Sequence, residues 1–306
     1  MVTDREMGVG TGAEGQYDAF TPTIWANDVR DAIEYEEILA GLVNTQYEAE
    51  MSIGQTLRVP IDANLNTQTK TEGVSSTITF QAMPGTSGTG INFQDVTVAT
   101  YQYAAQLLNA VLAVQSKYDE RQKISHKLGY SLMRGIEVSI AALPASFSQI
   151  VGTLGADPTL DNLRRAWQYL RDAGVTKNAH WVFGPAACSA FFANDKLTSK
   201  DFISGTSAIE SAKLPDILSF PVYQSNLLNA PAAGQTQCFL AHREAIILIR
   251  QIKPTVREQF LIRNLADGIV AYDLYNTSEA IWSAEAPTND SDPTVGDYGA
   301  VLIRSA

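Results

Sequence analysis

The chain has 306 residues, of which 45% are hydrophobic and 18% are charged, so it is long enough for one or two domains with buried cores. Its 33 acidic and 22 basic residues give a net charge of -11, which argues against a protein that grips nucleic acid through clustered Lys and Arg. Its two cysteines are too few for a disulfide framework, and its strongest apolar run, residues 245–249, is far too short to span a bilayer.

The N-terminal stretch, residues 1–51, is predicted to be an arm with one short helix. Residues 1–22 are Gly-rich and irregular, and they lack the apolar stretch of a secretory signal. Asn27 or Asp28 can cap a helix, acidic residues follow in its first turns, and Gly41 is a stop signal. We therefore expect an arm without a core of its own that leads into a helix.

Residues 52–101 are predicted to form a long polar ribbon. Strand-like runs at 55–60 and 91–98 flank a stretch rich in Thr, Gln, Asn, Ser and Gly, and residues 83–90 are dense in turn-forming residues. This segment has too few apolar residues for its own core, and a two-stranded ribbon is marginal alone. We expect the ribbon to lie on another surface, such as a second copy of the protein.

A long helix is predicted from Ala104 to Leu143, about 60 Å at 1.5 Å per residue. Within it, apolar residues occupy every fourth position: Ile124, Leu128, Leu132, Ile136 and Ile140. Because four residues turn a helix by about 400°, this apolar ladder winds around the helix and is expected to meet different partners at its two ends. The alternative is two shorter helices, broken near Ser116 or Gly129.

The predicted helix also contains two glycines and four basic residues. Gly129 and Gly135 each cost about 1 kcal/mol relative to Ala, and we expect them to allow close packing or a bend. The basic residues are Lys117, Arg121, Lys123 and Lys127. They are predicted to form a solvent-exposed helix face rather than a nucleic-acid site.

From residue 152 onward the sequence predicts short alternating helices and strands. A helix is expected to start at Asp157 and Pro158 and to end at Gly174, with Leu160, Leu163, Trp167 and Leu170 on its apolar face. Strands are predicted at 180–183, 220–225, 238–240, 245–250 and 268–275, and a short helix at 186–194. Pro221 indicates an edge strand. A short helix near 245–250 is the alternative to the strand there.

No motif in the sequence indicates catalysis or a bound cofactor. The glycines of residues 8–15 do not follow a strand and lack the Lys-Ser/Thr pair of a phosphate-binding loop. The three histidines are scattered, and the cysteines do not have metal-ligand spacing. Cys188 lies in an apolar helix and is interpreted as a core residue, and Asp290 and Asp292 as an acidic tail rather than a cation site. We therefore expect no catalytic, cofactor or metal site, and no enzyme.

The order of these parts resembles the major capsid proteins of tailed bacteriophages, which have the Hong Kong 97 fold. The run Pro-Val-Tyr-Gln-Ser at 221–225 is similar to a turn of that family. The resemblance covers nearly the whole chain and implies an α+β fold with an N-terminal arm, an extended β-hairpin loop, a long spine helix, and peripheral and axial domains. The implied parts are 1–51 (arm and short helix), 52–101 (extended loop), 102–151 (spine helix and peripheral domain), 152–235 (axial domain) and 236–306 (peripheral strands and C-terminal tail).

The resemblance implies a protein that self-assembles, as pentamers and hexamers, into the icosahedral head shell around the double-stranded DNA of a tailed phage. The implied partners are portal and scaffolding proteins, decoration proteins in some members, and packaged DNA contacted non-specifically, with no membrane and no cofactor. The implied location is the virion, after assembly in the cytoplasm of a host bacterium.

Four residues of the extended loop are candidates for contact with a neighbouring subunit: Arg58, Lys70, Phe80 and Phe93. The alternatives for them are a solvated charge and packing within the ribbon. Some members of the family cross-link a loop Lys to an Asn of a neighbour, which would pair Lys70 with Asn264 or Asn276. The preferred interpretation of Lys70 is a surface charge that keeps the exposed edge of the ribbon from pairing with another strand.

Three other classes of protein compete with this interpretation. An encapsulin-like nanocompartment shell would share the fold and carry a docking groove for a cargo peptide. A soluble enzyme with an unrecognised site would remain a monomer or a small oligomer. A tail or fibre protein is disfavoured because the sequence has no repeat of fixed period.

Overall fold

The computed structural model describes residues 34, 37–60, 69–70, 93–109, 120–198, 214–228, 236–281 and 299–305. Contacts divide the chain into two compact units, Met1–Glu34 and Tyr35–Ala306, and every described helix and strand belongs to the second unit. Several predictions concern residues outside the described part, namely the helix start at Asn27, the turn-rich stretch 83–90, the glycines of 8–15, and Asp290 with Asp292.

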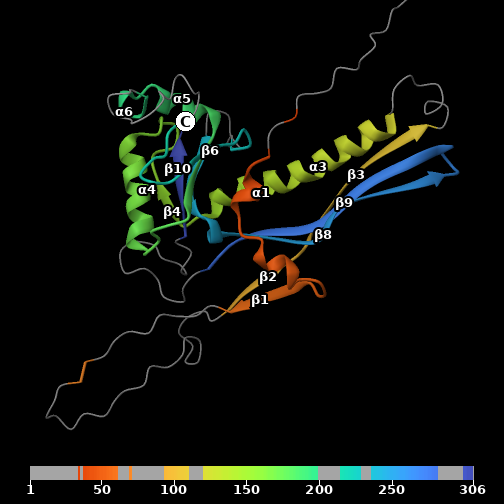
Figure 1. The fold of residues 1–306 in the computed structure, drawn as a ribbon, viewed down its shortest axis with the longest axis horizontal. Helices are drawn as coiled ribbons and strands as arrows, with labels where there is room; N and C mark the ends of the chain where they lie inside the picture. Colours follow the sequence, from red (N-terminus) through yellow and green to blue (C-terminus); the bar gives the residue numbers. More distant parts are fainter. Residues whose placement is uncertain are drawn as a thin grey trace, which may run out of the picture. The chain divides into compact units, whose positions relative to one another are not determined.

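Two β-sheets, a two-stranded ribbon and the helices packed against them make up the described fold (Figure 1). The strands are β1 Thr56–Pro60, β2 Phe93–Thr97, β3 Thr100–Asn109, β4 Gln149–Val151, β5 Ala179–Phe183, β6 Val222–Gln224, β7 Thr236–His242, β8 Ile246–Leu261, β9 Ala266–Glu279 and β10 Ala300–Ser305. The α-helices are α1 Leu39–Leu42, α3 Glu120–Ala142, α4 Leu160–Asp172, α5 Pro185–Phe192 and α6 Asp195–Thr198. Short 3-10 helices are η1 Gln46–Ala49, η2 Leu143–Ser146 and η3 Arg243–Ala245.

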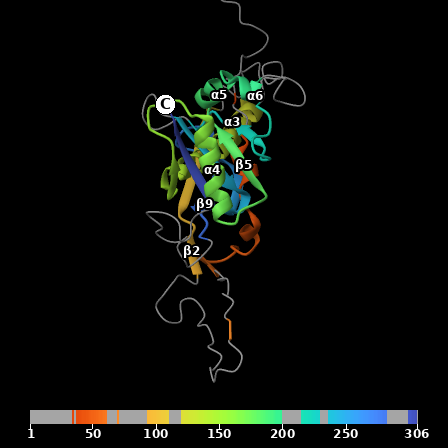
Figure 2. The ribbon, with the colours of Figure 1, turned by 90° about the vertical axis from the view of Figure 1, so that its left-hand side faces the viewer.

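The five-stranded sheet has the order β4-β10-β7-β5-β6 and is covered on both faces. Its central strands are continuous apolar runs, because successive side chains point to opposite faces and both faces are buried. In β5, Trp181 and Phe183 point into one core, whereas Val182 points into the other. Figure 2 shows α4 lying across one face of this sheet, and its buried residues belong to the same core as Trp181 and Phe183. β6 is an edge strand, as Pro221 predicts.

The helix α4 buries the face that the sequence predicts. Leu163, Ala166 and Leu170 are at most 1% exposed, and Leu160 and Trp167 pack against the same core. Burying three such side chains contributes several kcal/mol at about 25 cal/mol per Å² of apolar surface. The apolar spacing therefore identifies correctly which side of α4 meets the sheet.

The predicted start of α4 at Asp157 and Pro158 is wrong. The N-cap is Thr159, whose Oγ1 accepts a hydrogen bond from the backbone N–H of Asn162 at 3.3 Å. A Thr hydroxyl can cap a helix as well as an Asp carboxylate does. Because Thr159 is the cap, Pro158 lies one residue before the cap rather than at the first position of the helix. The helix ends close to the predicted stop, because Gly174 follows with a φ of 84° that favours glycine.

The three-stranded antiparallel sheet has the order β3-β9-β8, and α3 runs along one of its faces (Figure 1). The apolar ladder of α3 is buried throughout, with Ile124, Leu128, Leu132, Ile136 and Ile140 at most 6% exposed. Its first three residues pack with Leu108, Ile269 and Ala271 of this sheet. Its last two pack in a core shared with the five-stranded sheet. The predicted change of partner along the helix is confirmed.

The predicted helix start at Ala104 is wrong. Residues 100–109 form β3, which pairs with β9 from Thr100–Tyr275 to Asn109–Ala266. The helix α3 has 23 residues and continues through Gly129, so the alternative break there is also wrong, and Ser116 lies outside the described residues. The Ala, Gln and Leu residues of β3 favour a helix locally. The hydrogen bonds between β3 and β9 satisfy the backbone N–H and C=O groups of β3 instead.

A buried polar contact joins α3 to this sheet. Gly135 leaves room for Gln102, since a Cβ at that position would overlap Oε1 of Gln102. Gln102 Nε2 donates hydrogen bonds to Leu132 O at 2.8 Å and to Asp273 Oδ2 at 2.9 Å. Asp273 is 0% exposed, and burial raises the pKa of its carboxyl. Gly135 therefore allows close packing, as expected, whereas Gly129 faces open space.

The β1–β2 ribbon is antiparallel, with pairs from Thr56–Thr97 to Pro60–Phe93, which confirms its predicted strands. Its inner face packs on residues of η1, β8 and β9 and their connections, in a core of Met51, Val96, Val98, Ile247, Ile249 and Ala280. Gln94 adds a polar anchor, because its Nε2 donates to Glu279 O at 2.6 Å. The base of the ribbon thus lies on its own chain.

Three further predictions concern membrane-spanning helices, the cysteines and the end of the first helix. Among the helices that the structure describes, none is long and apolar enough to cross a membrane. Cys188 and Cys238 are both buried thiols, and Cys188 packs in the core beneath α5, as predicted.

The predicted stop at Gly41 is wrong by a short distance, because α1 continues through it to Leu42.

Candidate assembly surfaces

The outer face of the ribbon carries an ion pair beside an aromatic ring. Arg58 and Asp95 are cross-strand partners, so their side chains lie on the same face. Arg58 Nε donates to Asp95 Oδ1 at 2.7 Å and Nη2 donates to Oδ2 at 2.8 Å, which is the strong bidentate arrangement. The guanidinium also lies 4.0 Å from the centre of the Phe93 ring. The hydrogen bonds from Arg58 lower the pKa of Asp95 below its ordinary value.

The structure brings together two of the four predicted contact residues. Arg58 and Phe93 contact each other within the ribbon, while Phe93 keeps 38% of its surface exposed. Lys70 is exposed and belongs to a described stretch of only two residues, and Phe80 lies outside the described part. Contact of these residues with a neighbouring subunit stays a prediction, as does a cross-link from Lys70.

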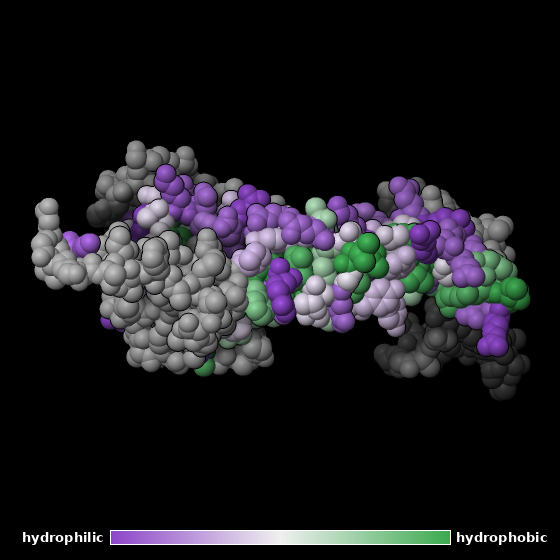
Figure 3. Space-filling model, turned by 90° about the horizontal axis from the view of Figure 1, so that it is seen from below, coloured by the Kyte–Doolittle hydropathy of each residue, from purple (hydrophilic) through white to green (hydrophobic). Residues whose placement is uncertain are grey.

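The turn between β8 and β9 is apolar and exposed. Ile262 is 81% exposed, Leu265 67% and Phe260 51%. Figure 3 shows hydrophobic residues gathered at this end of the three-stranded sheet. Leu265 also has a φ of 44°, a left-handed conformation that costs a side-chain-bearing residue about 1–2 kcal/mol. A concentration of exposed apolar side chains in one turn is typical of a surface that another protein covers. We call residues 260–265 the apolar tip.

A second exposed surface lies on the face of the three-stranded sheet opposite α3. Paired residues of antiparallel strands share a face, and the register pairs Tyr103 with Tyr272. Tyr101 is 60% and Tyr103 70% exposed, and the rings of Tyr101 and Tyr272 are 6.1 Å apart. Leu107, on the same face, is 50% exposed. We call Tyr101, Tyr103 and Tyr272 the tyrosine row. Tyrosines in such a row combine a large apolar ring with a hydroxyl, which suits a protein contact.

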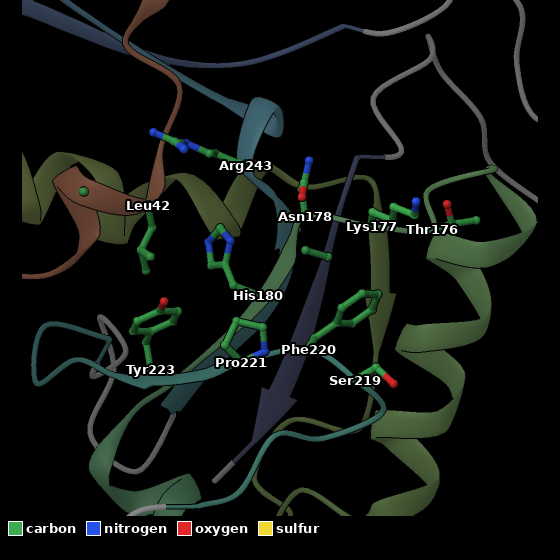
Figure 4. A pocket seen from close by; sticks show the side chains of 12 residues that line it. Leu42, Thr176, Lys177, Asn178, His180, Ser219, Phe220, Pro221, Tyr223 and Arg243 are labelled. Carbon is green, nitrogen blue, oxygen red and sulfur yellow. The ribbon is translucent and has the colours of Figure 1, made fainter.

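A groove of about 700 Å³ lies beside β6 (Figure 4). Its walls come from α1, the loop before β5, the loop before β6, and η3. His180 of β5 and Tyr223 of β6 form its centre, with their rings 6.2 Å apart. Lys177 and Arg243 are exposed at its rim. We call this cavity the β6 groove.

Burial favours the neutral forms of His180 and Cys188. Burial, with smaller contributions from the charges of His242 and Arg243, lowers the pKa of His180 to about 4. Burial raises the pKa of Cys188 to about 11, so its reactive thiolate is scarce at neutral pH. Within the part of the chain that the structure describes, no three His, Cys, Asp or Glu side chains are grouped to hold a metal ion.

Sequence reasoning missed three of these surfaces. The tyrosine row was hidden because residues 100–109 have helix-forming neighbours, although Tyr101 and Tyr103 alternate as in a strand. The apolar tip gave a usable signal, since Phe260, Ile262 and Leu265 cluster where two strands must turn. The β6 groove gave none, because its walls come from segments that are far apart in the sequence.

No protein-family model matches the chain, and no curated protein matches it either. Solved structures do match. A structure of Mycobacterium phage Che8 is 18% identical, with 93% of this chain and 97% of that chain covered and a TM-score of 0.73. The capsid of cyanophage P-SCSP1u is 15% identical over 100% of this chain and 99% of that one, with a TM-score of 0.69. The mature capsid of bacteriophage PhiM1 is 12% identical over 94% and 92%, with a TM-score of 0.68.

These likenesses establish the fold. The chain has the mixed α+β fold of these phage structures over nearly its whole length, so the predicted α+β fold and its likeness to phage capsid structures are confirmed.

Proposed function

We propose that the chain is a major capsid protein, whose copies assemble into the icosahedral head shell around the double-stranded DNA of a tailed phage. One observation carries the proposal. The likeness to phage structures spans at least 92% of both chains in each of the three comparisons above. A shared module within otherwise different proteins would leave large parts of one chain unmatched, so a likeness over the whole length of both chains supports the proposal.

The exposed surfaces support self-assembly. The apolar tip, the tyrosine row and the outer face of the ribbon are three separate surfaces, each carrying side chains that a partner can cover. A shell requires several modest contacts per subunit, made between different surfaces of neighbouring copies. Such heterologous contacts close into rings and then into a shell when the angles permit. We propose that residues 52–101 are the extended loop and that Arg58, Lys70, Phe80 and Phe93 contact a neighbour.

The remaining parts of the proposal concern the oligomers that the protein forms, its partner proteins and its location. The protein acts structurally, without catalytic turnover, in pentamers and hexamers. Its partners are portal and scaffolding proteins and, where present, decoration proteins, and it touches packaged DNA non-specifically. It assembles in the cytoplasm of a host bacterium and resides in the virion. The net charge of -11 supports weak contact with DNA, because an acidic wall does not adhere to phosphates.

The test is to express the chain alone and to measure particle mass by light scattering and particle shape by negative-stain electron microscopy. Closed shells of uniform size are the expected result. A monodisperse monomer at every salt concentration and pH, with and without a molecular crowding agent, would contradict assembly by this chain alone. Catalytic turnover by such a monomer would instead support an enzyme.

A further inference from the structure

The β6 groove has a charge opposite to that of the chain. The chain carries 33 acidic and 22 basic residues, yet the described residues that line the groove include Lys177 and Arg243 and no Asp or Glu. Neither Lys177 nor Arg243 forms an ion pair with another described residue. Two such cations at one groove attract an anionic group.

The two cations start from neighbouring positions of the backbone. The N–H of Arg243 donates a hydrogen bond to Asn178 O at 3.0 Å, and Lys177 directly precedes Asn178 in the chain. All three residues line the groove (Figure 4). An acidic segment that lies at this end of the groove can therefore meet both cations.

The centre of the groove holds a buried polar side chain without a partner among the described residues. His180 is 6% exposed, lines the groove, and forms no side-chain hydrogen bond with another described residue. Burial lowers its pKa to about 4, so the ring is neutral at pH 7 and has one N–H donor and one acceptor nitrogen. A buried polar group is normally hydrogen-bonded, so the ring favours a ligand that offers both an acceptor and a donor.

The strand beside the groove offers backbone groups as well. β6 is the last strand of its sheet, and Trp181 N donates a hydrogen bond to Pro221 O at 2.9 Å. Because alternate residues of a strand direct their backbone groups to the same side, those of Val222 and Gln224 point away from β5. The described part of the chain places no strand at that edge, and an extended peptide can add to it.

An acidic peptide matches these features better than a nucleic acid does. Its carboxylates suit the two cations, and its backbone supplies the C=O and N–H groups that His180 and the edge of β6 require. A phosphate backbone offers only acceptors, so it would leave the acceptor nitrogen of His180 without a donor. The net charge of -11 also repels a long polyanion more strongly than a short peptide.

We propose that the β6 groove binds an extended acidic segment of a partner protein other than this chain, with Lys177 and Arg243 contacting its carboxylates and His180 hydrogen-bonded to its backbone. The ring of Tyr223 offers a contact for an apolar or aromatic side chain of the same segment. The proposal goes beyond shell assembly, because the groove belongs to the single subunit and is present whether or not the chain forms shells.

Fluorescence anisotropy tests the proposal with the dilute full-length chain and a labelled synthetic peptide in which Glu alternates with Tyr and Val. The groove variant is Lys177→Gln with Arg243→Gln. The matched control is Lys253→Gln with Arg257→Gln, which removes the same charge from two exposed residues of β8. We expect the Kd of the peptide to rise about tenfold in the groove variant and to stay unchanged in the control. A peptide with Gln in place of Glu should bind the wild type about tenfold more weakly.

Hydrogen–deuterium exchange provides a second readout that requires no substitution. When the acidic peptide binds the wild-type chain, the amides of Val222 and Gln224 at the edge of β6 should exchange more slowly. The amides of the exposed residues 256–260 of β8 should not change. Thermal unfolding of each variant confirms that it is folded.

Four outcomes overturn the proposal. Failure of the acidic peptide to bind the wild type, or equal affinity for the groove variant and the control, would show that the groove is not its site. Bound peptide without slower exchange at β6 would place it elsewhere on the chain. Tighter binding of a single-stranded oligonucleotide of the same net charge, lost in the groove variant, would assign the groove to nucleic acid. Self-association of the chain that the peptide blocks would assign the groove to a second copy.

Discussion

The carboxylate of Glu137 accepts a hydrogen bond from the backbone N–H of Leu39 at 2.9 Å, across 98 residues of sequence. Its second oxygen accepts the N–H of Ala40 at 2.7 Å. Glu137 is 1% exposed, so this is a buried carboxylate whose partners are the first backbone donors of α1. The segment that leads out of the N-terminal arm is therefore fastened to α3 by a charge-assisted contact.

Glu137→Gln should lower the free energy of unfolding by about 1.5–3 kcal/mol, because the amide replaces one acceptor oxygen with a donor that faces a backbone N–H. Denaturant titration of the unassembled subunit measures the effect. Glu50→Gln makes the same change at an exposed position and should alter the unfolding free energy little. Equal effects of the two substitutions would show that the Glu137 contact is not stabilising.

Two glycines of α3 should respond in opposite ways to alanine. Gly135→Ala should lower the free energy of unfolding by about 1–3 kcal/mol, because the new Cβ displaces the inserted Gln102 amide. Gly129→Ala should raise it by about 0.5–1 kcal/mol, because nothing lies within 4 Å of its added Cβ and alanine favours the helix. Thermal and denaturant unfolding of the two variants side by side checks both signs. Stabilisation by Gly135→Ala would contradict the close approach of Gln102.

His180 should make the fold sensitive to mild acid. Its pKa is about 4 when folded and ordinarily 6.5, so the unfolded chain takes up a proton first as pH falls. The stability due to neutral His180 is present above about pH 6.5, declines as pH falls, and is lost near pH 4, a change of about 3 kcal/mol.

The measurement is denaturant unfolding at pH 7 and pH 4 for the wild type, His180→Gln and His126→Gln. His126 is exposed on α3 and serves as the control. The wild type and His126→Gln should lose more stability on acidification than His180→Gln does. Identical losses in all three proteins would rule out His180 as the cause.

The apolar tip should matter for assembly and not for folding. Leu265→Asp places a charge where 67% of the side chain is exposed, so the isolated subunit should unfold at nearly the same temperature as the wild type. The yield of shells, measured by light scattering, should drop strongly, because a buried unpaired charge is costly in an interface. Leu154→Asp, at a residue 51% exposed between β4 and α4, is the matched control. An equal loss of shells in both variants would contradict a special role for the tip.

The sequence predicts those parts of the fold whose pattern is set by one buried face. The ladder of α3, its change of partner, and the apolar face of α4 follow from spacing alone, because burial selects for apolar residues at a helical period. The strands β5 and β7 follow from short apolar runs between turn residues. Each of these signals lies within a single element.

Other parts of the fold depend on partners far away in the sequence. β3 contains helix-forming residues and becomes a strand because β9, more than 150 residues later, pairs with it. The candidate surfaces likewise include some residues that the sequence predicts and some contacts that only the fold reveals. Arg58 and Phe93 were predicted as contact residues from their place in the ribbon, whereas the pairing of Arg58 with Asp95 needed the register of the two strands. The β6 groove is visible only after folding brings its distant segments together.

The ladder of α3 also has a mechanical consequence. Leu132 and Ile136 are one helical turn apart, yet the first packs in a core of the three-stranded sheet and the second in the core that this sheet shares with the five-stranded sheet. A tilt of these two cores against each other therefore bends this turn of α3, which contains Gly135 beside the Gln102 amide. The bending stiffness of these few residues therefore sets how far the two cores can tilt against each other.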